Sequence, residues 1–332
     1  MARVTIEELA SRLGLSSASV SYALNGQPGV SDATRERVLA LAGELGWQAH
    51  ASARSLSRSR ADAVGLVLTR RAEAIGEEPY YMSLLAGIEA GLAAGGTSLM
   101  LRFVTAGEGS DLDVYRRWYA EHRVDGVLLF DLRVNDPRPE QLERIGLPFL
   151  VHGGRRADEG WQFDQGAEAA VLVAHLSELG HRRITHVTGP LTLLHERERH
   201  RAVRAECAAR GIEIDWVEAD YSFEAAVEVT TEALRTGSPP SALVYSNDLM
   251  AVGGLRALRD AGQEHHIAVT SWDDSVLCQT ATPAITALQR RTYDAGRRSA
   301  TLLLSALDAR WNDPEQVAPS TLVVRESTSS IA

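Results

Sequence analysis

The stretch Thr5–Gly26, TIEELASRLGLSSASVSYALNG, decides the fold of the N-terminal part of the chain. Thr5 and Glu8 have the spacing of a capping box, in which the Thr5 hydroxyl accepts from the Glu8 backbone N–H and the Glu8 carboxylate reaches back. A short helix with one apolar face follows, and Gly14 ends it because glycine tolerates a left-handed backbone. Ser16 then caps a second helix. Two helices joined by so short a turn predict a helix-turn-helix, whose second helix enters the major groove of DNA.

A third helix completes this head. Turn residues at 25–29 break the chain, Ser31 supplies a cap, and apolar residues recur on one face of 32–45. A generic three-helix bundle would give the same pattern. Small hydroxyl groups around the second helix favour the DNA-binding alternative, because they suit phosphates and base edges. The next segment, 50–60, is basic and serine-rich. It is too short to be a stable helix alone, so we interpret it as a linker that orders on DNA.

Charge divides the chain in the same place. The net charge is −10, but residues 1–60 hold seven arginines and five acidic residues, a net of +2, which leaves −12 for the remainder. An acidic body repels phosphate, so we expect DNA contact only at the head. The two cysteines and ten histidines form no metal-ligand pattern, so neither metal nor cofactor is expected. No apolar run could span a membrane or serve as a secretory signal, and we expect a cytoplasmic protein.

The rest of the chain alternates strand and helix patterns. Strands are predicted at 64–68, 98–103, 124–130, 147–151, 184–188, 216–219, 242–245, 267–271 and 321–324. Helices are predicted at 82–94, 112–121, 167–179, 198–209, 223–235, 249–261 and 293–307. Repeated βα units imply parallel, doubly wound sheets, and two successive runs imply two lobes. The fold class is therefore α/β with a small all-α head.

Ligands of such folds bind at the carboxyl ends of strands and between lobes. The residues that follow the predicted strands combine aromatic rings with Asn, Asp and Arg. This mixture suits a polyhydroxyl ligand, because a ring can stack on a sugar while the polar groups bind its hydroxyls. The candidates found in this way include Tyr80, Tyr81, His152, Asp164, Arg197, Arg199, Asn247, Asp248, Trp272, Asp273 and Asp274.

Over nearly its full length the sequence resembles the lactose-repressor (LacI/GalR) family of transcriptional regulators. The resemblance rests on ordered matches in the head and core: Val4–Ala10, Ser19–Gly26, Gly29–Val38, Ala53–Leu56, Glu178–Ile184, Gly189–Pro190, Arg197–Arg199, Ser246–Ala251, Trp272–Asp274 and Leu322–Ser327. It implies a helix-turn-helix domain at 1–48, a hinge helix or linker at 49–61 and a periplasmic-binding-protein-like core at 62–332. The N-lobe would comprise about 62–160 and 291–318, and the C-lobe about 161–290 and 319–330.

For the head, the resemblance implies a homodimer on a near-palindromic operator in double-stranded DNA. The second helix would contact bases through Ser17, Ala18 and Tyr22. Phosphates would be bound by Thr5, Ser16, Ser21, Asn25 and Ser31. The paired hinge helices would place Ala53 and Leu56 on the DNA, with Leu56 wedged into the minor groove. Many relatives have Arg where Tyr22 stands, so a strong Arg–guanine contact is missing there.

For the core, the resemblance implies a sugar or sugar derivative bound between the lobes, which controls operator affinity and makes the protein an allosteric repressor. Together with the strand-end candidates, the expected ligand-binding residues are Tyr80, Tyr81, Asp164, Arg199, Tyr221, Asn247, Asp273 and Arg290. Arg290 has two interpretations: it favours an acidic or phosphorylated ligand, or it is a surface cation that faces Glu or Asp.

Three alternatives stay open at this stage. A solute-binding protein would share the core but would need a secretory signal and no head. A regulator could sense a non-sugar metabolite such as a nucleobase. A hydrolase could be imagined around Arg197, Arg199 and Asp164 or His195, but the sequence has no matching catalytic motif, and we do not expect an enzyme.

Overall fold

The structure is a computed structural model that describes residues 4–47, 60–69, 76–104, 110–158, 160–308 and 317–328. The chain divides into two units, residues 1–61 and residues 62–332. Among the described residues, no helix is long and apolar enough to cross a membrane. The predicted DNA contacts Ala53 and Leu56 lie outside the described residues.

The head consists of three helices, α1 (Ile6–Leu13), α2 (Ser17–Leu24) and α3 (Asp32–Glu44). Each begins at a hydroxyl cap, because the side chains of Thr5, Ser16 and Ser31 accept from backbone N–H groups of the first turn. Gly14 ends α1 with φ of 66°, as predicted. The reciprocal half of the predicted capping box is wrong: the Glu8 carboxylate accepts instead from Arg12, at 2.7 Å.

The head has its own small apolar core. Leu9 of α1, Val20 of α2 and Val38 of α3 are each fully buried in it. All three helices contact one another. The spacing of apolar residues that predicted the helices therefore also determines how the helices pack.

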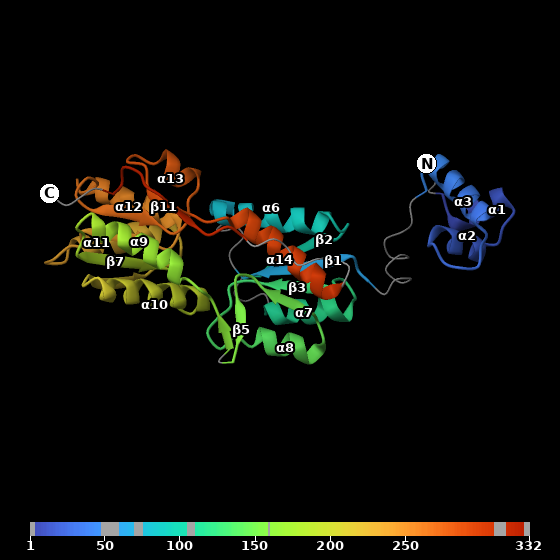
Figure 1. Ribbon diagram of the computed structural model, residues 1–332, viewed down its shortest axis with the longest axis horizontal. Helices are drawn as coiled ribbons and strands as arrows, with labels where there is room; N and C mark the ends of the chain where they lie inside the picture. The colour runs from blue at the N-terminus through green and yellow to red at the C-terminus, as the bar shows by residue number, and fades with distance from the viewer. Residues whose placement is uncertain are drawn as a thin grey trace. The chain divides into compact units, whose positions relative to one another are not determined.

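The N-lobe is built on a parallel four-stranded sheet with the order β2-β1-β3-β4. Its strands are β1 (Ala63–Leu68), β2 (Ser98–Phe103), β3 (Gly126–Leu129) and β4 (Phe149–Val151). Figure 1 shows α6 (Pro79–Ala93) and α14 (Thr292–Leu307) on one face of the sheet, with α7 (Asp111–Ala120) and α8 (Arg138–Ile145) on the other.

Helices α6 and α14 are far apart in sequence and pack very closely. A Cβ added to Gly87 would lie 2.0 Å from the backbone carbonyl oxygen of Tyr293, and one added to Gly296 would lie 2.5 Å from that of Leu84. Only glycine allows the two backbones to approach in this way. The last helix of the chain is thereby held in the first lobe.

The C-lobe is built on a six-stranded sheet with the order β12-β11-β10-β9-β7-β8, parallel except for β12. Its strands are β7 (Arg183–Thr188), β8 (Glu213–Glu218), β9 (Ala242–Tyr245), β10 (Ala268–Ser271), β11 (Thr286–Gln289) and β12 (Thr321–Val323). Helices α9 (Gly166–Glu178) and α10 (Leu194–Ala209) cover one face. Helices α11 (Phe223–Leu234), α12 (Asp248–Asp260) and α13 (Val276–Thr280) cover the other.

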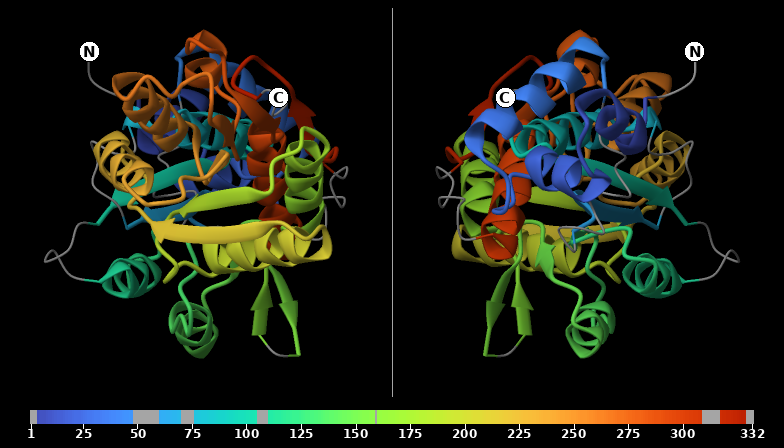
Figure 2. Two further views of the ribbon diagram at one scale, coloured as in Figure 1. Left: turned by 90° about the vertical axis from the view of Figure 1, so that its left-hand side faces the viewer. Right: turned by 90° about the vertical axis from the view of Figure 1, so that its right-hand side faces the viewer.

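The structure confirms the α/β class and contains elements that the sequence patterns missed. Helix α8, helix α13 and strand β11 were not predicted, and β8 begins three residues earlier than expected. The hairpin of β5 (Arg155–Ala157) and β6 (Gly160–Gln162) was also missed. Figure 2 shows this hairpin projecting from the core on the same side as α8.

Candidate functional site

A cavity of about 100 Å³, here called the central pocket, lies between the lobes. Seven of the eight predicted ligand-binding residues line it: Tyr80, Tyr81, Arg199, Tyr221, Asn247, Asp273 and Arg290. Asp164 does not, because it lines a neighbouring cavity. Sequence reasoning missed several further lining residues: Glu78, Phe130, Asp131, Phe163, Gln165, His195 and Ser246.

The N-lobe wall of the central pocket is aromatic. The rings of Tyr80 and Tyr81, at the start of α6, meet edge to face with centroids 5.4 Å apart. The Tyr81 hydroxyl donates to the Asp131 carboxylate at 3.1 Å. Phe130 stacks on His152 at 4.5 Å. The pKa of His152 is lowered to about 3, mainly by burial and to a smaller extent by the nearby Arg290. The imidazole is therefore neutral at physiological pH.

The C-lobe wall rests on a buried carboxylate, Glu196 of α10, which is completely inaccessible. Glu196 accepts from the Tyr221 hydroxyl at 2.5 Å, from the Ser246 hydroxyl at 2.6 Å and from the Arg199 guanidinium at 3.4 Å. Burial alone would raise the pKa of Glu196, but Arg199, His195 and His186 outweigh it, and the net pKa is lowered. Glu196 is therefore an anion that holds three pocket residues in place.

Behind this wall lies a buried pair of histidines. The Nδ1 atoms of His186 and His200 are 3.2 Å apart, and His186 Nε2 lies 3.2 Å from the Ser246 hydroxyl. The pKa of His186 is lowered to about 3, mainly by burial. Trp272, a candidate from the sequence, is fully buried here and lies beneath the Arg199 guanidinium, 4.7 Å from the ring centroid. It supports the pocket without lining it.

Arg290 lines the pocket from the short connection between β11 of the C-lobe and α14 of the N-lobe. Its guanidinium donates to the Asp273 carboxylate at 3.0 Å and lies 5.7 Å from the centroid of the Tyr80 ring. Of the two interpretations of Arg290, the structure shows the paired cation. Arg199 is also paired, so neither pocket arginine is left to neutralise an anionic ligand here.

Two pocket residues have a left-handed backbone that is rare outside glycine: Asp131 has φ of 48° and Tyr221 has φ of 72°. Such conformations persist where the surroundings hold them, and they cluster at functional sites. Asn247 fixes Tyr221, because its amide donates to the Tyr221 carbonyl at 3.1 Å. The Asn247 side-chain oxygen meanwhile caps α12 through Met250 N–H, at 2.8 Å.

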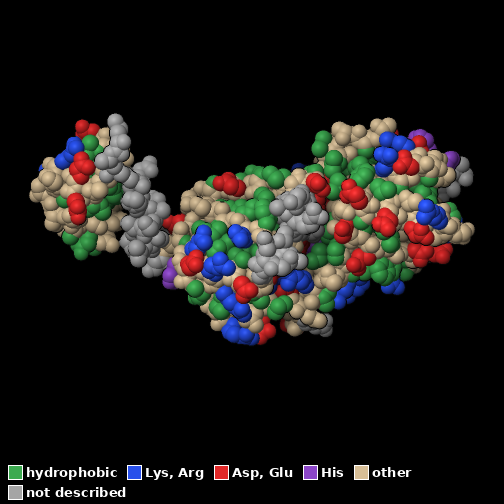
Figure 3. Space-filling view, turned by 180° about the vertical axis from the view of Figure 1, so that it is seen from behind, with side chains coloured by type: hydrophobic (Ala, Val, Ile, Leu, Met, Phe, Trp, Pro, Cys, Tyr) green, Lys and Arg blue, Asp and Glu red, His purple; other side chains and the backbone are tan. Residues whose placement is uncertain are grey.

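In the head, the predicted DNA-binding side chains sit on and around α2. Ser17, Ala18 and Tyr22 are exposed, and Tyr22 retains 44% of its accessible surface. Thr5, Ser16, Asn25 and Ser31 are exposed as well, and Ser21 is half-buried. Figure 3 shows acidic side chains scattered over the face of the core that it presents, in keeping with the acidic balance of residues 61–332.

A helix-turn-helix unit joined to a two-lobed core with a polar pocket defines a transcription regulator. Comparison with known families supports this class. Residues 5–49 match the model for bacterial regulatory proteins of the lacI family, and residues 173–328 match the model for a periplasmic binding protein-like domain.

Two curated relatives cover the whole chain. The transcriptional regulator CelR of Thermobifida fusca is 32% identical over 98% of each chain. The transcriptional regulator AglR of Rhizobium meliloti is 30% identical over 98% of this chain and 94% of that one. The chain therefore belongs to the lacI family of bacterial transcription regulators, and it is not an enzyme.

Two solved structures of known proteins have a similar fold. A CelR–cellobiose complex superposes with a TM-score of 0.72 at 29% identity, covering 98% of this chain and 100% of that one. The lac repressor dimer bound to operator and an anti-inducer has a TM-score of 0.82, covering 99% and 100% of the two chains. At 23% identity, that likeness shows the fold alone.

Proposed function

We propose that this protein is a cytoplasmic repressor that binds a near-palindromic operator as a homodimer. Its affinity for the operator would fall or rise when a sugar binds the central pocket. Residues 1–48 would read the operator, residues 49–61 would form the paired hinge, and residues 62–332 would bind ligand and dimerise. The observation that carries the proposal is a pocket lined from both lobes by aromatic rings and hydrogen-bonding groups.

The chemistry of the central pocket favours a neutral polyhydroxyl ligand. Tyr80, Tyr81 and Tyr221 offer ring faces, while Asn247 and Asp273 offer amide and carboxylate groups to hydroxyls. Both arginines already have carboxylate partners inside the protein. A relative, CelR, has been solved with cellobiose. A nucleobase sensor is the second candidate, since the aromatic rings would also stack on a purine.

Coupling between the two sites follows from the position of the pocket. A ligand that contacts both lobes favours one arrangement of the lobes relative to each other. Both lobes belong to the core, and the hinge would join the core to the head. The expected coupling free energy is about 1–3 kcal/mol, typical of such regulators.

Two variants test the proposal separately. Leu56→Ala should weaken operator binding, and Asp273→Ala should abolish the ligand response while operator binding stays intact. Operator affinity would be measured by fluorescence anisotropy and ligand binding by calorimetry. Unchanged operator affinity in Leu56→Ala would remove the wedge role, and wild-type ligand affinity in Asp273→Ala would remove the pocket assignment.

A further inference from the structure

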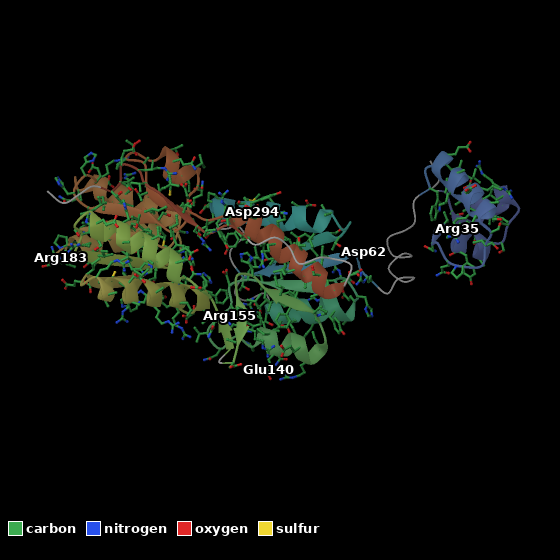
Figure 4. All side chains as sticks on the ribbon, in the orientation of Figure 1. Arg35, Asp62, Glu140, Arg155, Arg183 and Asp294 are labelled. Carbon is green, nitrogen blue, oxygen red and sulfur yellow. The ribbon has the colours of Figure 1, made fainter. Side chains whose placement is uncertain are left out.

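A second cavity, larger than the central pocket, lies beside it. This outer cavity has a volume of about 1000 Å³. It lies between the β5–β6 hairpin, helix α10 and the loop 132–136 that follows β3. Figure 4 shows Arg155 on the hairpin, at the side of the core where α8 lies. Nothing in the proposed function uses this space.

The two cavities share a wall made of Gly153, Phe163 and Gln165. Weak side-chain contacts hold that wall. The ring of Phe163 meets His195 edge to face at 6.2 Å, and Arg199 Nε lies 3.5 Å from the Gln165 amide oxygen. Both contacts are long, and the Gln165 amide also donates to the Asp164 carbonyl oxygen at 3.0 Å; rotation of the Phe163 and Gln165 side chains would join the cavities. A ligand longer than one sugar ring could then extend from one into the other.

Arginine dominates the charge of the outer cavity, and much of that charge is already compensated. Arg133 pairs with Asp111 at 2.7 Å, and Arg201 pairs with Glu198 at 2.6 Å. The carboxylate of Asp136, which also lines the cavity, is neutralised by the buried Arg138. These groups leave no excess charge for a ligand.

Two arginines remain on opposite sides of the outer cavity. Within the described residues, the guanidinium of Arg155 on the hairpin bonds only to a neutral group, the Gln162 amide oxygen, at 2.7 Å. Arg197 of α10 is exposed, and its guanidinium has no hydrogen-bond or ion-pair partner within the described parts of the chain. Against them stands one carboxylate, Asp164, which accepts from the Gly166 N–H at 3.0 Å. The half-buried indole of Trp161 forms an apolar surface beside them.

We propose that the outer cavity is a second subsite for an oxyanion carried on a sugar, so that the effector is an acidic oligosaccharide. This inference rests on the proposed function. A neutral ring would fill the central pocket, and an acidic ring would lie against Trp161, with its carboxylate or phosphate between Arg155 and Arg197. Planar guanidinium groups bind such oxyanions through paired hydrogen bonds. Asp164 would then bind a hydroxyl of the second ring, which gives a role to the one predicted residue that lies outside the central pocket.

Calorimetry on the full chain tests the subsite. The probes are glucuronate, galacturonate, glucose 6-phosphate and the glucuronate-terminated analogue of cellobiose, each against its uncharged counterpart: glucose, galactose or cellobiose. We expect at least one acidic probe to bind about tenfold more tightly than its counterpart, as for a charge-assisted contact. Comparing the uronates with the sugar phosphate shows whether the subsite prefers a carboxylate or a phosphate. The double variant Arg155→Gln/Arg197→Gln should lose the preference, and Arg235→Gln, an exposed arginine on a distant helix end, should keep it.

The inference is wrong if no acidic probe binds more tightly than its neutral counterpart, or if the double variant retains the preference. The proposed function fails differently, since it requires bound sugar to change operator affinity. Neutral sugars that alter operator affinity with no gain for acidic ones would overturn the subsite and leave the regulator intact.

Discussion

Glu196 provides the sharpest test of how the pocket is built. The change Glu196→Ala removes a fully buried carboxylate and leaves Arg199, Tyr221 and Ser246 without their shared acceptor. Removing one partner of a buried ion pair typically costs about 3–5 kcal/mol, because the other charge stays buried and unpaired. In a domain of this size each kcal/mol shifts the midpoint of thermal unfolding by about 2–4 °C, so we expect a fall of about 6–20 °C.

The matched control is Glu198→Ala, two residues along the same helix. Its ion pair with Arg201 is partly exposed, since the Arg201 side chain keeps 80% of its accessible surface and the Glu198 side chain keeps 19%. Exposed pairs contribute about 0.2–1 kcal/mol, so the midpoint should move by less than about 4 °C. Both variants would be measured by circular dichroism on the full chain. Equal midpoints for Glu196→Ala and Glu198→Ala would refute the claim that Glu196 holds the pocket wall.

Three further predictions concern other parts of the chain. Gly87→Ala should strongly destabilise the core in urea unfolding, because the added Cβ would lie 2.0 Å from a backbone oxygen. Gly76→Ala, whose Cβ would have no neighbour within 4 Å, should leave the midpoint of unfolding unchanged, and similar midpoints for the two variants would contradict the packing. His186 has a pKa of about 3 in the folded protein and about 6.5 unfolded, so its stability contribution is complete above pH 6.5 and falls by about 2 kcal/mol at pH 5. His152 has a similarly lowered pKa and is kept in His186→Asn, so urea unfolding should show a loss between pH 6.5 and 5 that is about 2 kcal/mol smaller in the variant than in wild type; equal losses would contradict the assignment to His186. Leu9→Ala should cost the head about 2–5 kcal/mol and reduce operator binding in an anisotropy titration, and undiminished affinity would argue against a rigid head.

Local chemistry explains why the head was predictable. Helix caps such as Thr5, Ser16 and Ser31 act within three residues, so a sequence pattern contains the whole interaction. The pocket was partly predictable for a different reason. Asn247 and Asp273 stand two residues after the ends of β9 and β10, and parallel strands bring their carboxyl ends to one edge of the sheet.

Longer-range contacts were not visible in the sequence. Glu196 and His200 lie four residues apart on the buried face of α10, but their partners lie elsewhere in the sequence: His186 within β7 and Ser246 just after β9. The available signal was a polar residue at a helix position that the apolar spacing predicts to be buried. That spacing does not show which residue elsewhere in the chain forms its hydrogen bond. Asp164 lies between the β5–β6 hairpin and α9 and lines the outer cavity; the sequence pattern did not show this hairpin, so it could not tell which of the two cavities Asp164 would line.

The measurement that tests the central claim most directly is operator affinity with and without bound sugar. An operator would be selected from random duplexes, and its dissociation constant measured by fluorescence anisotropy, alone and with the sugar that most raises the unfolding temperature of the protein. We expect a near-palindromic operator and a change in the dissociation constant of about fivefold or more, in either direction. A dissociation constant unchanged at saturating sugar would contradict it.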